Sequence, residues 1–397
     1  MSLTPPIRTA ETQRRWQGAA LWSRGFRPFF LGAGIWAVVA IALWMPTYEG
    51  ELSLRTAFSP VDWHAHEMIF GYIAAVVAGF LTTAIPNWTG RMPVAGGRLA
   101  ALAGLWAAGR LAVLFSAWLG RPLAAAIDVA FLVVFAALVA REVVAGKSRR
   151  NVVVAALVSA LALANLAFHF EDARNGVADY SIRAALSLVV MLILLIGGRV
   201  APSFTHNWLA RIGDARRPTP FSRADGIVMA LSGVALAAWT VAPDAVWSGA
   251  LCVAAGLGNL GRLSRWRGWL ARRDALVLIL HVGFGLASVG FLLAGAHGLW
   301  PSHVPYDAGI HTWAIGGAGT MTLAMMTRAT LGHTGSALVA TRATEIAYVA
   351  VLVALVGRLG LAFQPGLTMF WLHVAALGWL VAFGAFLIGY APRLIRR

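Results

Sequence analysis

Three side chains that could bind a metal or transfer protons lie close together in the stretch WHAHEMIFGY at residues 63–72. They are His64, His66 and Glu67, and a long run without another charge follows them. Imidazole suits iron, copper and zinc, while a carboxylate can ligate copper, orient a histidine or pass protons. Because residues i and i+2 of a helix point to nearly opposite sides, His64 and His66 share one metal only if His64 precedes the first turn. Otherwise His66 faces one centre and His64 serves another.

The histidines separate by their depth along the apolar segments that carry them. Five are expected toward the outer side and form the predicted set of metal ligands: His64, His66, His169, His311 and His373. Polar groups inside a membrane are costly and usually face a bundle interior, so several imidazoles at one depth predict a shared metal site. For each single histidine, capping a helix or bonding to a loop is the alternative. We favour that alternative for His297 and His303, which lie in a loop with two prolines.

Two charges fall inside neighbouring apolar segments, Arg110 in the third and Asp128 in the fourth. They come at similar depths on the two arms of one helical hairpin. An isolated charge at that depth would be very costly, so a buried ion pair is the simplest role for both residues. A part in a proton path or in binding a haem propionate is the alternative.

The composition indicates an integral membrane protein. Of the 397 residues, 59% are hydrophobic and 12% are charged, and the mean hydropathy is +0.73. The formal net charge of +16 does not indicate nucleic-acid binding, because the basic residues lie in short gaps between apolar segments, where they fix membrane orientation. The single cysteine, Cys252, excludes an internal disulfide and a Cys-based zinc or iron–sulfur site.

Long apolar segments recur from end to end and predict an all-α bundle of about twelve transmembrane helices. They fall at 26–46, 66–86, 98–119, 122–145, 151–170, 181–201, 225–242, 246–262, 274–296, 309–328, 343–363 and 367–390. Both termini are expected in the cytoplasm, because the basic loops then share one side of the membrane. The first segment is too long for a signal-peptide core. We expect one integral membrane domain over 1–397, with 1–24 as a polar cytoplasmic N-terminal segment.

An internal repeat is indicated by similar signatures at the predicted cytoplasmic ends of three helices that are four apart. They read IPNWTGR after the second segment, APSFTHNWL after the sixth and TRATLGHTG after the tenth. In addition, AGRLA in the third segment is echoed by VGRLG in the eleventh. The pattern predicts a pseudo-threefold arrangement of three sets of four helices.

Several motifs together resemble the NnrS family. They are GFRPFFL at 25–31, WHAHEMIFGY at 63–72, PNWTGR at 86–91, GGRVAPSFTHNW at 197–208 and MTRATLGHTG at 326–335. The resemblance spans the chain and implies a twelve-helix protein of the bacterial inner membrane that contains haem, expected to be of b type, and copper. It also implies a part in nitric oxide metabolism, denitrification and resistance to nitrosative stress. His206 stands where we expect the family to carry a basic residue such as arginine, which makes it a poor ligand candidate.

The resemblance and the histidine depths together lead to a functional hypothesis. A His-coordinated metal site near the periplasmic face is expected to bind nitric oxide and to reduce it, as an oxidoreductase similar to nitric oxide reductase. The haem ligands are expected among His66, His281, His311 and His373, and Glu67 is the candidate catalytic residue that supplies protons. For His281, a core histidine bonded to a backbone carbonyl is the alternative.

Two other classes of protein stay open at this point. Twelve helices with internal repeats are also a common plan for transporters, so a metal-handling permease is one alternative. A sensor or scavenger that holds nitric oxide without turnover is the other. The expected partners are nitric oxide or a related small gas, the lipid bilayer and an electron donor that the sequence does not identify. Nucleic acid is not an expected partner.

Overall fold

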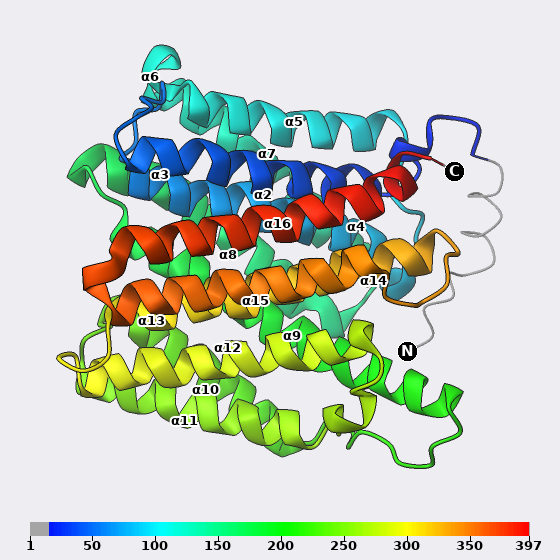
Figure 1. Ribbon diagram of the computed structural model, residues 1–397. Coiled ribbons are helices and arrows are strands. Elements are labelled where there is room, and N and C mark those ends of the chain that lie inside the picture. The colour runs from blue at the N-terminus through cyan, green and yellow to red at the C-terminus, as the bar shows by residue number, and fades with distance from the viewer. Residues whose placement is uncertain (1–15, 397) are drawn as a thin grey trace. The chain divides into compact units, whose positions relative to one another are not determined.

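The computed structural model of the protein describes residues 16–396, and these residues form helices joined by loops (Figure 1). The described part contains no β-strand, so the all-α prediction is confirmed. Each of the twelve predicted segments lies on a helix, and ten helices are long and apolar enough to cross a membrane. The chain is therefore a multi-pass membrane protein. The cytoplasmic placement of the termini stays a prediction, and residues 1–15 of the predicted N-terminal segment lie outside the described residues.

Contacts between residues divide the chain into two compact units. Unit 1 comprises the described residues of Met1–Ala185 together with Ala329–Ser336 and Leu387–Arg397. Unit 2 comprises Leu186–Arg328 and Ala337–Phe386. The expectation of one integral membrane domain stays a prediction.

Unit 1 is built mainly from the first half of the chain. Its elements are α2 (Phe26–Tyr48), α3 (Pro60–His66), the π-helix η2 (Glu67–Ile73), α4 (Ala74–Thr89), α5 (Gly97–Leu114), α6 (Ser116–Leu119), α7 (Arg121–Ala145) and α8 (Val152–Asn175), with 3-10 turns at Ala20–Trp22 and Arg149–Asn151. Helix α2 packs against α4 and η2, and α7 packs against α4, α5 and α8. The core of the unit is thus the set of faces that these six elements turn toward one another.

The start of α3 decides where the first candidate residues point. Ser59 caps this helix, since its hydroxyl accepts a hydrogen bond from the Asp62 N–H at 3.1 Å. Pro60 follows in the first turn, where its missing N–H costs nothing. The helix therefore begins at Pro60, well before the predicted segment start at residue 66, and His64 lies inside it.

Arg27, in the motif GFRPFFL, joins the start of α2 to the end of α16 (Thr368–Ile395) within unit 1. Its Nη1 donates to the carbonyl oxygens of Arg393 at 3.1 Å, Leu394 at 2.9 Å and Arg396 at 2.8 Å. Carbonyls at the end of a helix have no partner within the helix, so the guanidinium satisfies them. This side chain is the link between the first and last long helices of the described chain.

Unit 2 contains the elements from the middle of α9 onward. They are α9 (Asp179–Arg211, from Leu186), α10 (Arg223–Val241), α11 (Val246–Ser264), the 3-10 turn η4 (Gly268–Ala271), α12 (Ala275–Leu299), α13 (Tyr306–His311), the π-helix η5 (Thr312–Gly319), α14 (Thr320–His333, to Arg328), α15 (Arg342–Phe363), the 3-10 turn Pro365–Leu367 and α16 as far as Phe386. Helix α12 packs against α11, α13 and η5. It approaches α11 closely because both carry glycine at the contact: a Cβ on Gly249 would lie 2.7 Å from the Gly295 carbonyl oxygen.

Two helices that the sequence predicts as regular contain π-helical segments. In unit 1, η2 follows α3, and in unit 2, η5 follows α13. Each segment ends in an i→i−5 bond, from Ala74 to Ile69 and from Thr320 to Ile315. The same number of positions separates the members of five pairs: Pro60 and Pro305, Asp62 and Asp307, His66 and His311, Gly71 and Gly316, Gly90 and Gly335. The second and tenth predicted helices thus share local structure as well as their terminal signatures.

Candidate metal centre

His66 lies at the centre of a buried group of oxygen acceptors in unit 1. It is fully buried at the end of α3. Its Nδ1 lies 3.0 Å from Glu67 Oε1, and its Nε2 lies 3.1 Å from Asp128 Oδ2 and 3.0 Å from Asn165 Oδ1. Carboxylate and amide oxygens only accept hydrogen bonds. Both ring nitrogens must therefore present a hydrogen, or Nε2 must face a bound cation instead.

The orientation of the Asn165 amide follows from the carboxylate beside it. Asn165 Nδ2 donates to Asp128 Oδ2 at 2.9 Å. Since a carboxylate cannot donate to an amide oxygen, this contact fixes which end of the amide faces Asp128. Asn165 Oδ1 is then turned toward His66 Nε2. This nitrogen must therefore carry a hydrogen, unless a cation binds to its lone pair.

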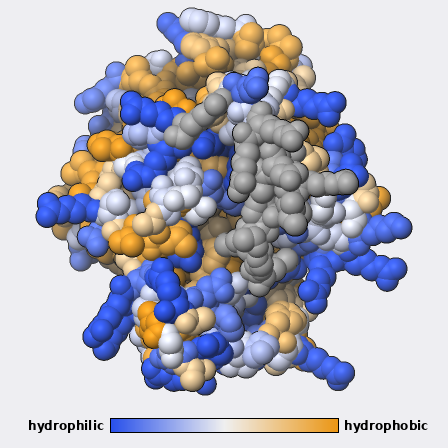
Figure 2. Space-filling view, turned by 90° about the vertical axis from the view of Figure 1, so that its right-hand side faces the viewer, coloured by the Kyte–Doolittle hydropathy of each residue, from blue (hydrophilic) through white to orange (hydrophobic). Residues whose placement is uncertain are grey.

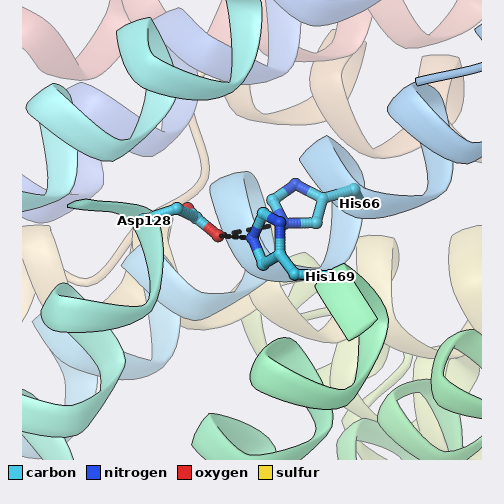
Figure 3. A group of neighbouring side chains, drawn as sticks. All are labelled: His66, Asp128 and His169. Carbon is cyan, nitrogen blue, oxygen red and sulfur yellow. Dashed lines mark hydrogen bonds and ion pairs between the residues drawn. The ribbon is translucent and has the colours of Figure 1, made fainter. Parts of the chain in front are cut away.

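His169 completes a set of three metal-binding side chains. It follows Asn165 by one turn on the same face of α8, and its Nε2 lies 2.9 Å from Asp128 Oδ2. One ligand atom each from His66, Asp128 and His169 lies within 4.8 Å of the others, and all three residues are buried. Figure 3 shows the two imidazoles turned toward the Asp128 carboxylate from different helices. No further group of three such ligands was found in residues 16–396.

Arg110 holds the two carboxylates of this cluster. Its Nη1 donates to both oxygens of Glu67, at 2.8 Å and 2.7 Å, and its Nη2 donates to Asp128 Oδ1. The predicted ion pair of Arg110 with Asp128 is confirmed, and it extends to Glu67. Two carboxylates against one guanidinium leave one negative charge, which an imidazolium or a metal ion would balance.

Glu67 has the contacts of a residue that orients its neighbours. Besides Arg110 and His66, its Oε2 accepts a hydrogen bond from Trp36 Nε1 at 2.7 Å. The absence of a side chain at Gly71 makes this arrangement fit, because a Cβ there would lie 2.8 Å from Glu67 Oε2 and 2.8 Å from Arg110 Nη1. The sequence leaves three roles open for Glu67. The contacts of its carboxylate with His66 and with Arg110 favour the role of orienting these neighbours.

Aromatic rings enclose the cluster. The His66 ring centroid lies 4.6 Å from Phe168, 5.0 Å from Phe70 and 6.1 Å from Phe58. Phe58 also lies 5.7 Å from His169, and the Arg121 guanidinium lies over the Phe58 ring, 5.6 Å from its centroid. This shell excludes water from the charges, which strengthens every interaction between them.

His64 does not belong to this cluster. Because α3 already includes it, its side chain points away from that of His66 and stacks on Trp44, with ring centroids 4.2 Å apart. The interpretation in which His64 and His66 share one metal required His64 to precede the helix. That alternative is wrong, and the reason is the early helix start at Ser59 and Pro60.

The other predicted ligands lie in unit 2, and each has local partners there. His281 Nε2 lies 2.7 Å from Thr205 Oγ1. His311 donates from Nδ1 to the Asp307 carbonyl at 2.9 Å, and its Nε2 faces Arg358. His373 is exposed and donates from Nδ1 to the Met369 carbonyl at 2.8 Å. Their roles as ligands stay predictions.

His297 and His303 have the hydrogen bonds that were favoured for them, but only His303 lies in the loop. The loop position predicted for His297 is wrong, because α12 continues to Leu299 and includes it. His297 lies 2.9 Å from Asp244 Oδ1 and 2.8 Å from the Val304 carbonyl. His303 lies 3.0 Å from Ser302 Oγ. His303 is therefore held by its neighbour in the chain, and His297 by one contact nearby and one with Asp244.

Sequence reasoning missed Asn165 and gave Asp128 only an ion-pair role. A signal for Asn165 exists, because it is the one amide in the apolar run 152–170 and it precedes His169 by four positions, which puts both on one helix face. Nothing comparable ties Asp128 to a histidine, since their contact depends on how α7 and α8 pack.

Comparison with known proteins gives one informative result. A search of curated protein sequences found no match. Residues 20–397 match the family described as NnrS protein. This range covers nearly the whole chain and includes every residue of the candidate centre. The chain therefore belongs to the NnrS family, which makes it a membrane protein related to nitric oxide.

Proposed function

We propose that the chain binds nitric oxide at a transition-metal ion held by His66, His169 and Asp128. The observation that supports this proposal is the convergence of their three buried ligand atoms within 4.8 Å. Two imidazole nitrogens and one carboxylate oxygen suit copper or iron and do not suit magnesium or calcium. The donor set thus fits copper, one of the two metals that the family resemblance implies. The metal would supply the binding position for the gas.

Neighbouring residues would hold His66 ready as a ligand. Ligating histidines usually donate their second ring N–H to a carboxylate, which fixes the tautomer and the ring orientation. Glu67 Oε1 occupies that position at His66 Nδ1, 3.0 Å away. Arg110 donates to both Glu67 and Asp128 and so holds the two carboxylates in place. With this assignment Glu67 orients a ligand, and proton supply by Glu67 stays a separate proposal.

The aromatic shell suits a small apolar ligand. Phe70 and Phe168 contact the His66 ring, and Phe58 contacts both this ring and Arg121. Nitric oxide is a small apolar gas that dissolves in the bilayer, so it can approach through the packed rings while water and ions are excluded. The shell would thereby select for the ligand without any polar contact to it.

Haem fits this centre poorly. The His66 ring is enclosed by phenylalanines, and both of its nitrogens face oxygen atoms. His281 Nε2 bonds Thr205, and a Cβ on Gly268 would lie 2.4 Å from its Nδ1, so neither nitrogen has space for a porphyrin. His373 is exposed and donates from Nδ1 to the Met369 carbonyl. Any haem that the family resemblance implies is therefore proposed in unit 2, where His311 and His373 stay the candidate ligands.

Metal analysis of purified variants tests the copper proposal. We expect His66→Ala and His169→Ala each to lose the bound metal, while His303→Ala retains it because that residue lies in a loop. Nitric oxide added anaerobically to the wild-type protein should change the optical or electron paramagnetic resonance signal of the metal. Full metal content in both His66→Ala and His169→Ala would contradict the assignment.

Turnover is tested separately from binding, because reduction also requires electrons and protons. Protein in liposomes receives nitric oxide anaerobically together with a chemical reductant. Consumption that continues beyond one equivalent indicates a reductase, and consumption that stops there indicates a sensor or scavenger. Metal transport without nitric oxide binding would indicate the permease. We place this activity in the bacterial inner membrane, with the metal centre toward the periplasmic side.

A further inference from the structure

A buried guanidinium in unit 2 has no counter-charge bound to it. Arg328 lies on α14 and is 8% exposed. Its guanidinium carbon lies 4.0 Å from the ring centroid of Phe204 on α9, so the aromatic ring covers one face of the group. Nη1 is fully buried and has no hydrogen-bond partner. A buried charge without a partner is strongly unfavourable, which points to a ligand that supplies the missing anion.

The carboxylate that interacts electrostatically with Arg328 is already engaged elsewhere. Asp274 interacts electrostatically with Arg328. However, its oxygens cap the start of α12, where Oδ1 accepts from the Val277 N–H at 3.2 Å, and Oδ2 accepts from Arg211 Nη2 at 3.2 Å. Among the described residues no ion pair forms between Asp274 and Arg328. Only Arg211 bonds to this carboxylate, so two guanidinium groups stand against one negative charge and the net charge of the three groups is positive.

The surroundings of Arg328 give access and further positive charge. Arg211 ends α9, and its side chain is 55% exposed, so one edge of the group reaches the surface. Arg272, Arg273 and Arg342 are exposed at the starts of α12 and α15. Figure 2 shows hydrophilic side chains projecting from the helix ends at the right of Figure 1. This basic side is the one predicted to face the cytoplasm.

We infer that Arg328 and Arg211 bind a phosphate group at this end of unit 2. A guanidinium offers parallel N–H donors that match two oxygens of one phosphate, and stacking on Phe204 fixes the plane of those donors. The phosphate would complete the hydrogen bonding of Arg328 Nη1 and balance the excess charge. Its source is either free phosphate or the headgroup of an anionic phospholipid, because the site lies at helix ends near a membrane surface.

Binding by purified full-length protein tests the inference. In one arm, inorganic phosphate is titrated at constant ionic strength with chloride, and the unfolding temperature reports binding. In the other arm, the protein is placed in nanodiscs of phosphatidylcholine with or without phosphatidylglycerol, and native mass spectrometry counts the retained lipids. We expect Arg328→Gln to weaken binding in one arm by on the order of tenfold or more. Arg211→Gln should weaken binding by a smaller factor, because the Arg211 side chain is exposed and its contact with phosphate competes with water.

The control is Arg98→Gln, which removes an exposed arginine of α5 in unit 1 and should bind as the wild type does. A difference in the phosphate arm alone identifies free phosphate, and a difference in the lipid arm alone identifies a headgroup. If Arg328→Gln does not fold, Arg328→Lys keeps the charge but loses the paired donors, and it should bind more weakly than the wild type. Equal binding in both arms by the wild type and the folded Arg328 variant would overturn the inference.

Discussion

The two π-helical segments place a histidine at the same point but surround it with opposite charge. Around η2 in unit 1, the carboxylates of Glu67 and Asp128 contact His66 and Arg110. All four side chains are buried. The excess charge of this group is negative, so it can accommodate a cation.

Around η5 in unit 2 the carboxylates are replaced. Thr312 stands at the position that matches Glu67, and His373 stands at the position that matches Asp128 when the spacing between the π segments is applied. The Thr312 hydroxyl donates to its own helix, at the Ala308 carbonyl, 2.7 Å away. Arg358, from the echoed VGRLG motif, contacts His311 directly. A guanidinium therefore faces the histidine in unit 2, where carboxylates face it in unit 1.

The comparison separates the role of the backbone from the role of the side chains. A π segment holds a histidine near the start of a long helix in both units, so this geometry by itself does not make a metal centre. Two carboxylates, together with Asn165 and His169 from α8, distinguish unit 1. Substituting these side chains should therefore change the stability and the metal content of unit 1, and substitutions at the matching positions of unit 2 should change them much less.

The largest effect is expected from Asp128→Ala. This change removes the acceptor shared by Arg110, His66, Asn165 and His169 and leaves a buried charge uncompensated, so the free energy of unfolding should fall by about 3–5 kcal/mol. Denaturant unfolding of purified protein in detergent measures it. The matched change in unit 2, His373→Ala, alters an exposed residue and should stay within about 0.5 kcal/mol. Similar losses for the two variants would refute the comparison.

The next effect is expected from Glu67→Thr, which copies unit 2 into unit 1. Arg110, His66 and Trp36 each lose an acceptor, and we expect a loss of about 3 kcal/mol. Glu67→Gln keeps the size and one acceptor oxygen, so its loss should be nearer about 1–2 kcal/mol. In unit 2, Thr312→Val removes one hydroxyl bond and serves as the control. The same unfolding measurement applies, and a Thr312→Val loss as large as that of Glu67→Thr would count against the distinction.

A smaller effect is expected from adding one methyl group to each π segment. In Gly71→Ala the Cβ would lie within 2.8 Å of Glu67, Arg110 and Trp36, so the charge cluster must shift, at a cost of about 1–3 kcal/mol. In Gly316→Ala the Cβ would lie 3.0 Å from Leu286 and Leu355, whose side chains can adjust, and the cost should be below about 1 kcal/mol. Metal content should fall only in Gly71→Ala. Equal metal content in both variants would separate η2 from the centre.

Much of the fold could be predicted, because the bilayer sets the length and polarity of each helix. The twelve segments, the all-α class and the Arg110–Asp128 pair follow from burying charges at a given depth in an apolar phase. The π segments could not be predicted, since an extra residue in one turn leaves the apolar run unchanged. The early start of α3 is marked by the cap at Ser59 and not by the apolar run, which begins later. The direction of the His64 side chain follows from that start.

The candidate centre was predictable in part. Depth along a helix brings His66 and His169 to one level, and the structure places them together against Asp128. Depth does not determine which face of a helix a residue occupies or which helix lies opposite. The contacts of Asp128 and Asn165 with the histidines depend on both, because they come from the packing of α7 and α8 against the start of η2.

The bond between Arg27 and the end of α16 has a consequence for how the protein is made. A ribosome delivers Arg27 to the membrane early and Arg393, Leu394 and Arg396 only after the residues of unit 2 have been synthesised. Until then the Arg27 guanidinium lacks the three carbonyl oxygens that accept its hydrogen bonds. An early-synthesised helix is thus anchored only once α16 is complete, and a truncation shortly before residue 393 would leave α2 without this anchor even though every residue of the candidate metal centre is present.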